Sequence, residues 1–386
     1  MDLTGAVRRR AARRPAVFTV GWPGATRQRL EVEAEVRRRG WSTPQSPAAA
    51  DLLVVCGTAP DGAATGWIDG VERAVPPPVA RVTVSREGQA ADALDAGQRL
   101  LATGAGPAGR AGDEAAGTPM AGRGDDRDGL RLDRLRLPLG PGLADWPAGL
   151  VLHLTLQGDV VQQVEVATVG VAGTGTAGAD PVAPVPPFWD EPWLLAARGT
   201  PVTVGDAERR RCAAHLDSAG RLLATAGWAD PAARFRRLRD GILAGAPAER
   251  VGPELRATAG RVLRSRTLRW LTAGLGPLPA ARAREFGVTG PAFQAAGDAH
   301  DRLRVWLRTA VGGLTAFGDG TPLAPGDLAG PRGDLGRDLP PSLALLDVLP
   351  ALVTGAEFAA VRTVLASLDP DLDELVASPL PGAVGG

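Results

Sequence analysis

The sequence has no lysine, no asparagine and no tyrosine among its 386 residues, so all 43 basic residues are arginine. A bias this uniform is typical of GC-rich coding, and arginine abundance therefore says little about function. The 43 acidic residues bring the net charge to zero. Because dedicated nucleic-acid-binding domains carry a clear positive surplus, no nucleic-acid partner is predicted.

Cysteine and histidine are also scarce. The two cysteines, Cys56 and Cys212, lie far apart in the sequence, whereas an iron–sulfur cluster takes four thiolates. They cannot form a disulfide framework, and they fit a reducing cytoplasm. His153, His215 and His300 show no paired spacing, so each is predicted to be structural rather than a metal ligand. The sequence thus predicts no metal site and no cofactor of its own.

Long apolar runs are missing too. No stretch reaches the roughly 18 residues of a transmembrane helix, so no membrane-spanning segment is predicted. Residues 1–14 form a basic tail, which is predicted to be solvated or to make weak contacts with anionic lipid or a partner. This tail lacks the apolar core of a secretory signal.

Residues 15–102 have the pattern of an α/β domain. A strand is expected at Val17–Val20, followed by a charged helix at Gln28–Arg39. The apolar runs Asp51–Gly57 and Val79–Val84 predict two further strands. Strands that alternate with helices favour a parallel sheet, and we expect a truncated flavodoxin-like domain.

The rest of the chain changes character twice. Residues 103–128 are rich in Gly, Ala and Asp and are predicted to be a linker. Residues 129–170 form a small β subdomain with an antiparallel hairpin, in which Leu150–Leu156 and Val160–Val166 flank a Gly-Asp turn. A Gly- and Pro-rich linker is expected at 171–187.

Residues 188–386 are predicted to be a mainly helical bundle. Apolar residues recur at helical spacing, which indicates helices around 212–223, 255–271, 298–314 and 343–368. The predicted fold class is therefore a multi-domain α+β chain.

Two local motifs admit more than one interpretation. Gly21–Thr26 follows a strand as a dinucleotide-binding turn does, but it lacks the third glycine and the later acidic residue. A structural turn is favoured, and a soluble NAD-binding or nucleotide-binding regulatory module remains the alternative. The acidic cluster Asp369–Glu374 would suit either a hard cation or a helix N-terminus.

Several longer stretches occur in an order that resembles two subunits of complex I, the NADH-quinone oxidoreductase. Arg39–Trp41, Ser46–Thr58 and Pro76–Val84 resemble the B subunit, a relative of the small subunit of nickel–iron hydrogenases. Later stretches resemble the D subunit, a relative of the hydrogenase large subunit. These are Leu139–Pro141, Gly149–Val166, Gly297–Arg302, Pro331–Gly336 and Ser367–Pro370.

The chain departs from both families where they bind cofactors. The B subunit holds a four-iron cluster on cysteines that begin after its first strand, where this chain has Gly21–Gly24. The D subunit binds quinone through a His-Arg-Gly segment and a tyrosine, where this chain has Ala167–Gly170 and no tyrosine. Hydrogenases carry a Cys-x-x-Cys nickel motif after the Asp-Pro segment, and the matching positions are Asp371 and Glu374.

The resemblance implies a fused, cofactor-less subunit, and thus no catalytic, cofactor-binding or metal-binding residue. Such a chain would lie on the cytoplasmic, inner face of the cell membrane, against membrane subunits of a complex I-like or antiporter-like assembly. Its role would be structural or coupling. One alternative is a genuine oxidoreductase-type subunit whose cofactors lie on neighbouring chains. The candidate interdomain or intersubunit contact residues are Asp298, Asp301, Arg302, Arg332 and Asp334; helix capping and loop closure within one domain is the other interpretation of these residues.

Overall fold

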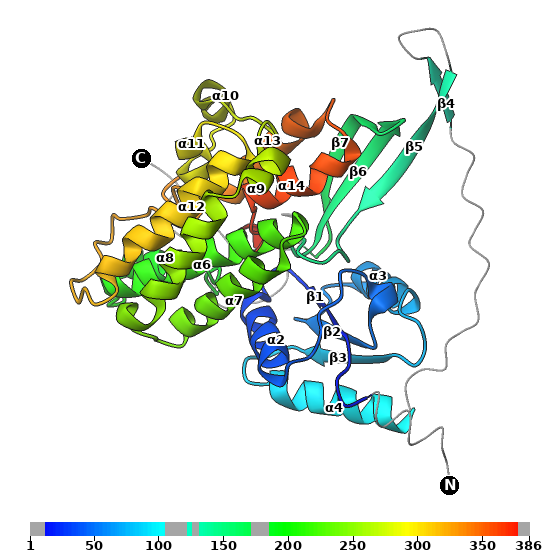
Figure 1. The fold of residues 1–386 in the computed structure, drawn as a ribbon, viewed down its shortest axis with the longest axis horizontal. Coiled ribbons are helices and arrows are strands. Elements are labelled where there is room, and N and C mark those ends of the chain that lie inside the picture. The colour runs from blue at the N-terminus through cyan, green and yellow to red at the C-terminus, as the bar shows by residue number, and fades with distance from the viewer. Residues whose placement is uncertain (1–11, 105–121, 126–130, 171–184, 377–386) are drawn as a thin grey trace. The chain divides into compact units, whose positions relative to one another are not determined.

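The computed structural model describes residues 12–104, 122–125, 131–170 and 185–376. These residues form two compact units (Figure 1). Unit 1 comprises residues 1–153 and 167–179, and unit 2 comprises residues 154–166 and 180–386. The tip of a long hairpin therefore belongs to the second unit, although most of that unit is C-terminal.

Unit 1 contains a three-stranded parallel sheet in the order β1-β2-β3. The strands are Val17–Gly21, Leu52–Cys56 and Ala80–Val84, which confirms the three strands expected from the sequence. Val17 pairs with Leu52, and Leu52 pairs with Ala80. All five residues of β2 are buried, as a central strand covered on both faces requires.

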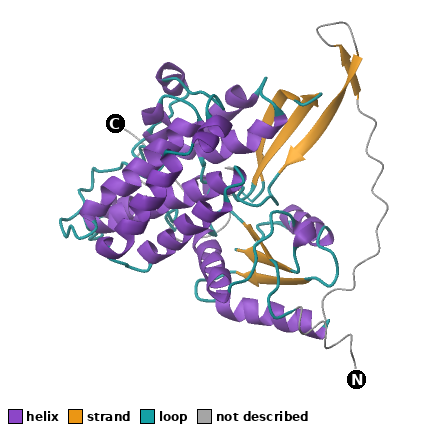
Figure 2. Cartoon of the chain, viewed as in Figure 1, coloured by secondary structure: helices purple, strands orange, loops and turns teal. Residues whose placement is uncertain are grey.

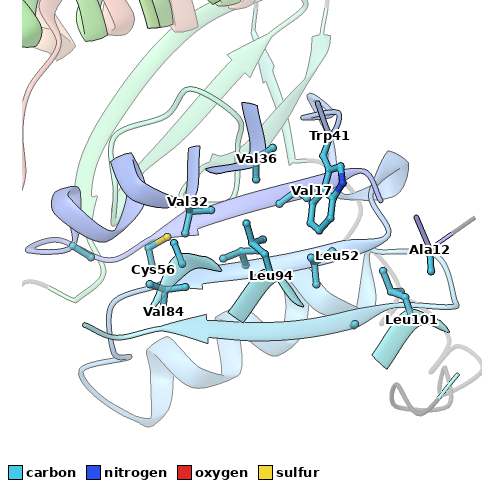
Figure 3. Packing of buried hydrophobic residues seen from close by; sticks show 14 residues of the cluster. Ala12, Val17, Val32, Val36, Trp41, Leu52, Cys56, Val84, Leu94 and Leu101 are labelled. Atoms are coloured by element: carbon cyan, nitrogen blue, oxygen red, sulfur yellow. The ribbon is translucent and has the colours of Figure 1, made fainter. Parts of the chain in front are cut away.

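Helices cover both faces of this sheet (Figure 2). On one face, α2 (Thr26–Arg39) and α4 (Ala90–Thr103) pack through Val32, Val36 and Leu94 (Figure 3). On the other face, α3 (Gly62–Arg73) contributes Ile68 and Val71 to a second core. Because successive strand residues point to opposite faces, each strand supplies both cores. Leu52, Val54 and Cys56 belong to the first and Leu53 and Val55 to the second.

A four-stranded sheet has the order β4-β5-β6-β7. The strands are Gly122–Asp125, Arg131–Leu139, Leu150–Gln157 and Val160–Thr168, and β4 pairs with β5 in antiparallel register. The last two strands are the expected hairpin. The sequence analysis did not predict β5, although its leucines alternate with charged residues. The strand β4 lies within segment 103–128, which was expected to be a linker; residues 105–121 and 126–130 of the chain, like 171–184, lie outside the described residues.

The described part of unit 2 is mainly helical. Helix α6 contacts α7, α12 and α14 and is the central element of the bundle. Unit 2 also has a short 3-10 helix at Leu314–Ala316, and unit 1 has one at Pro47–Ala49. The helices are α5 (Glu191–Ala197), α6 (Val204–Thr225), α7 (Ala229–Leu243), α8 (Ala248–Leu263), α9 (Arg266–Thr272), α10 (Ala280–Glu285), α11 (Gly290–Ala295), α12 (Ala299–Gly313), α13 (Pro341–Val353), α14 (Phe358–Leu368) and α15 (Asp373–Val376).

Two of the expected helices are divided in the structure. The segment expected at 255–271 breaks where Ser265 caps α9, accepting a hydrogen bond from Leu268 N at 3.2 Å. The segment expected at 343–368 breaks after Val353, where Gly355 has φ of 84°. The hairpin tip pairs with the residues of that break: Gly355 N donates to Val161 O at 2.8 Å. A tertiary contact between distant segments therefore ends a helix that its own apolar pattern would continue.

The predicted fold class, a mixed α+β chain with an α/β part, a hairpin region and a helical bundle, is confirmed. The division into a tail, domains and linkers at the stated boundaries stays a prediction. Of the expected basic tail, the described residues are Ala12, which is buried, and the exposed Arg13 and Arg14. Among the helices that the structure describes, none is long and apolar enough to cross a membrane.

Candidate functional site

Arg332 is a charged side chain in the interior of unit 2. It lies in the loop between α12 and α13 and is 7% exposed. Its Nε donates to the backbone oxygen of Asp369 at 2.7 Å, and its Nη2 donates to Asp369 Oδ2 at 2.6 Å. Only a guanidinium offers donors in this fork. The loop passes close to Gly290, where a Cβ atom would lie 2.5 Å from the Arg332 oxygen.

Asp369 ends α14 in the left-handed conformation, with φ of 50°. Aspartate is one of the few side chains found there besides glycine. Its Oδ2 also accepts a hydrogen bond from Ser218 Oγ at 2.7 Å, and Arg221 Nη1 lies 3.9 Å from its Oδ1. Burial raises the pKa of Asp369, against the opposing effects of Arg332, Arg221 and Ser218. One carboxyl group thus joins the end of α14 to α6 and to the Arg332 loop.

Two further buried carboxyl groups follow in the sequence. Asp371 is 8% exposed and Glu374 is 5% exposed. Ser342, at the start of α13, binds both segments: Asp371 N donates to Ser342 Oγ at 2.8 Å, and Ser342 N donates to Glu374 Oε2 at 2.8 Å. Asp371 Oδ2 lies 3.7 Å from Arg332 Nη1. The two positions that match hydrogenase thiolates therefore lie beside a buried arginine.

Asp190, at the start of α5, is fully buried. Burial raises its pKa to about 7, with Arg332 opposing and Asp371 and Asp373 contributing to the rise. Burial likewise raises the pKa of Asp371 to about 6, helped by Asp373 and opposed by Arg332. It raises the pKa of Glu374 well above its usual range, and Asp190 and Asp371 add to that rise. Each carboxyl group here makes its neighbours harder to ionise.

We call these five residues the Arg332 cluster: Asp190, Arg332, Asp369, Asp371 and Glu374. Burial works to lower the pKa of Arg332, but the surrounding carboxyl groups raise it above its ordinary value, so the guanidinium stays charged. Several polar atoms of the cluster have no hydrogen-bond partner among the described residues. They are both carboxyl oxygens of Asp190, Arg332 Nη1, Asp371 Oδ2 and Glu374 Oε1.

Arg302 is a second buried arginine and is likewise fixed by hydrogen bonds. Its Nε and Nη2 donate to Ser367 Oγ at 3.0 and 2.7 Å. Its Nη1 donates to the backbone oxygens of Gly276 at 3.0 Å and Gly297 at 3.1 Å. Burial lowers the pKa of Arg302 to about 10, against the opposing charges of Asp298 and Asp301. This side chain ties the start of α12 to the end of α14.

The remaining candidate residues make local contacts within unit 2. Asp298 and Asp301 form a capping box at the start of α12, and Asp298 Oδ2 also accepts from Gly274 N at 2.7 Å. The side chain of Asp334 is 52% exposed and lies 3.6 Å from Arg337 Nε. The structure thus brings Arg302 and Arg332 together through the end of α14, where each binds a residue of Ser367–Asp369, and leaves Asp334 apart. These contacts cap helices and close loops within unit 2.

One cavity adjoins the cluster and a second lies nearby, and both are lined in part by His215, Pro291 and Pro331. The inner one has a volume of about 10 Å³ and reaches Arg332 and Asp369. The outer one, of about 600 Å³, is more open. Burial lowers the pKa of His215 to about 3, with Arg211 and Arg332 adding to the effect, so the imidazole that lines both cavities is neutral.

The side chains present do not fit the cofactors of the families that the sequence resembles. Cys56 belongs to unit 1 and Cys212 to unit 2, and burial raises the pKa of both thiols, that of Cys212 to about 12. A thiol ligand must be deprotonated. The two positions that resemble the hydrogenase nickel motif carry the carboxyl groups of Asp371 and Glu374, and the guanidinium of Arg332, 3.7 Å from Asp371 Oδ2, would repel a metal ion. Among the described residues, no group of three histidine, cysteine or acidic side chains could hold a metal ion.

The turn at Gly21–Thr26 has the contacts of a structural turn. Gly24 has φ of 86°, and Ala25 N donates to Trp22 O at 3.1 Å. The Trp22 ring is buried and packs edge-on against Trp67 at 5.7 Å between ring centroids. The first residue of α2 is therefore positioned by packing within unit 1.

Sequence reasoning missed several residues of the site. Asp190 and Ser342 carry no periodic or motif signal, since each is one polar residue at a helix start. Ser218 is one polar residue inside α6 and carries no motif signal either. The buried pair of Asp217 with Arg239 on α7 was also missed. Only Ser367 and Asp369 could have been predicted as site residues, because both lie in the stretch Ser367–Pro370, which resembles the D subunit.

Comparisons with known proteins identify no family for this chain. No protein-family model matches the chain, and no curated protein matches it. Among solved structures, it is similar to a chain of the membrane-bound sulfane sulfur reductase, an archaeal respiratory membrane complex. The TM-score is 0.44 at 16% identity, over 64% of this chain and 99% of that one.

Proposed function

We propose that this chain is a peripheral subunit of a membrane-bound complex I-like or hydrogenase-like, ion-translocating assembly. In this role it holds no redox cofactor of its own and is structural or coupling. It would lie on the inner face of the membrane, in the place that B and D subunits take. The proposal rests on the ordered sequence stretches together with one structural observation.

That observation is the meeting of three stretches that were matched separately. Gly297–Arg302, Pro331–Gly336 and Ser367–Pro370 are far apart in the sequence, yet Arg302 binds Ser367 and Arg332 binds Asp369. Chance resemblances would have no reason to converge on one network. Their convergence supports a shared framework with the D subunit, and it draws only on residues of unit 2.

The chemistry of that network supports a role without redox chemistry. Electron transfer needs a cofactor, which the protein only positions and tunes. Where the hydrogenases hold nickel, this chain has a fixed positive charge surrounded by carboxyl groups. A chain with such a network can retain the framework and the interfaces of the family, but the network supplies no thiolate to bind a metal ion.

Purification of a tagged chain from membranes in mild detergent tests this function. We expect integral membrane subunits of an ion-translocating assembly to copurify with it. Recovery from the soluble fraction alone, with no membrane partner after mild crosslinking, would overturn the proposal. Cofactor absorbance that copurifies with neighbouring chains would instead favour the oxidoreductase-type subunit.

A further inference from the structure

The Arg332 cluster holds more buried carboxyl groups than its cations can compensate. Arg332 contacts Asp369 through two hydrogen bonds, and this pair is electrically balanced. Asp190, Asp371 and Glu374 remain, and all three are at least nine-tenths buried. Three ionised carboxylates in that interior would repel one another, and burial of an ionised group that lacks compensation is strongly unfavourable.

The other charged groups around the cluster do not remove this excess. On α6, Arg221 lies near Asp217 and Asp369, Arg210 pairs with Glu191, and His215 is neutral. On α7, Arg239 pairs with Asp217. On α15, Asp373 adds a further acidic side chain. The loop before α13 contributes Arg332, and α13 itself contributes the uncharged Ser342.

Unpartnered oxygens occur on the same three side chains. Neither oxygen of Asp190 has a hydrogen-bond partner among the described residues, and the same holds for Asp371 Oδ2 and Glu374 Oε1. Buried polar atoms are rarely left in this state. A proton on one carboxyl group would remove a negative charge and also supply a donor.

We propose that Asp190, Asp371 and Glu374 form a buried proton-binding site, with Arg332 as its fixed counter-charge. A carboxylate of the site takes a proton from water and becomes a neutral carboxyl group, and it returns that proton to water when it ionises. A small cavity lined by Arg332 and Asp369 lies next to the site. The site uses only residues of unit 2 and holds whether or not the chain docks on a membrane assembly.

A metal ion would not serve as the occupant. The guanidinium of Arg332 lies within 3.7 Å of Asp371 Oδ2, where it would repel a cation. A proton needs no set of ligands and tolerates this charge, because it neutralises one carboxylate without adding bulk.

Infrared spectroscopy of the full-length protein tests the site directly. At about pH 6, exposed carboxyl groups are ionised, so a carbonyl band of a protonated carboxyl group that shifts in heavy water would report a buried one. We expect this band in the natural protein, and we expect it to weaken as the pH rises through about 7, where Asp190 ionises. Asp190→Asn and Glu374→Gln should each weaken the band, whereas Asp338→Asn, at an exposed position of the same unit, should leave it unchanged.

Two results would overturn the proposal. The first is the absence of the band at about pH 6 in the natural protein, which needs no variant and so does not depend on the folding of one. The second is a band that persists at full strength in Asp190→Asn, Asp371→Asn and Glu374→Gln alike. Membrane copurification is not read in this experiment, so failure of the site and failure of the proposed function are distinguishable.

Discussion

At the scale of residues, the molecule is distinguished by arginines in its interior. Arg302 is fully buried, and its guanidinium donates to a serine hydroxyl and two backbone oxygens. Arg332 is bound to the carboxylate and the backbone oxygen of one residue. The desolvation of a charge is strongly unfavourable unless hydrogen bonds satisfy it, so removal of a partner should be far more damaging here than on the surface.

Asp369→Asn tests the pair with Arg332. Asparagine keeps the shape and tolerates the left-handed backbone at φ of 50°, so the change isolates the charge. Because the change replaces the charged acceptor of the hydrogen bond from Arg332 by a neutral amide oxygen, we expect the free energy of unfolding to fall by about 1.5 to 3 kcal/mol. Urea denaturation measures this fall. The matched control is Asp230→Asn, which removes the exposed pair with Arg261 and should leave stability unchanged.

The pH dependence of stability tests Asp190. Its pKa is raised to about 7 in the folded chain, so between about pH 4 and pH 7 the folded state holds a proton that the unfolded state releases. The contribution of Asp190 to stability therefore falls as the pH rises through this window, by up to about 1.4 kcal/mol per pH unit. His215, whose pKa is lowered to about 3, contributes the opposite slope.

When the free energy of unfolding of the natural protein is subtracted from that of Asp190→Asn, the contribution of His215 cancels, because both proteins contain this histidine. We expect the variant to gain in relative stability from about pH 5 to pH 7 and the gain to level off above that range. Urea denaturation at several pH values measures the difference. A difference that does not vary with pH would contradict the raised pKa of Asp190.

At the scale of elements, the end of α14 is the meeting point of unit 2. Ser367 Oγ accepts a hydrogen bond from Arg302 of α12. Asp369 Oδ2 accepts hydrogen bonds from Arg332, in the loop before α13, and from Ser218 of α6. α15 is held through Ser342 on α13. The helices of the bundle are thus joined by specific polar contacts as well as by apolar packing.

Arg302→Lys tests whether that joint depends on the guanidinium. Lysine keeps the charge but cannot reproduce the four hydrogen bonds to Ser367, Gly276 and Gly297. We expect a loss of about 2 to 4 kcal/mol in the free energy of unfolding. Arg304→Lys, two positions along the same helix and 42% exposed in its side chain, is the matched control, and equal effects of the two changes would contradict the account.

The turn before α2 gives a further prediction, for nucleotide binding. Because Trp22 of this turn is buried in the core of unit 1 and packs against Trp67, we expect calorimetry to detect no tight binding of NAD or other nucleotides. Tight binding that Gly24→Asp abolishes would favour the regulatory-module alternative.

Local patterns predicted the elements, but they did not predict the site. Alternation and continuous apolar runs indicated β1, β2, β3 and the hairpin, because the side-chain pattern of a strand can be recognised from a few adjacent residues. The breaks within the helices around 264 and 354 were missed, since a cap and a contact with the hairpin tip set them. The partners of Arg332 come from α5, α14 and the segment around α15. No spacing in the sequence indicates that these distant segments lie together.

At the scale of the whole molecule, buried charged side chains are gathered in unit 2, in the Arg332 cluster. The two units each have their own core, and the cluster lies within unit 2 alone. A chain of this kind would contribute interfaces to an assembly, and a proton-binding site would let it respond to pH without any redox group.

The metal content of the purified full-length chain tests the proposal that the chain holds no redox cofactor of its own. Elemental analysis for iron and nickel, together with the visible absorption spectrum, should find neither metal in stoichiometric amount, because the positions that resemble the nickel motif carry carboxyl groups, and Arg332 lies 3.7 Å from one of them. Stoichiometric iron or nickel carried by this chain alone, with a cluster absorption band, would contradict the account.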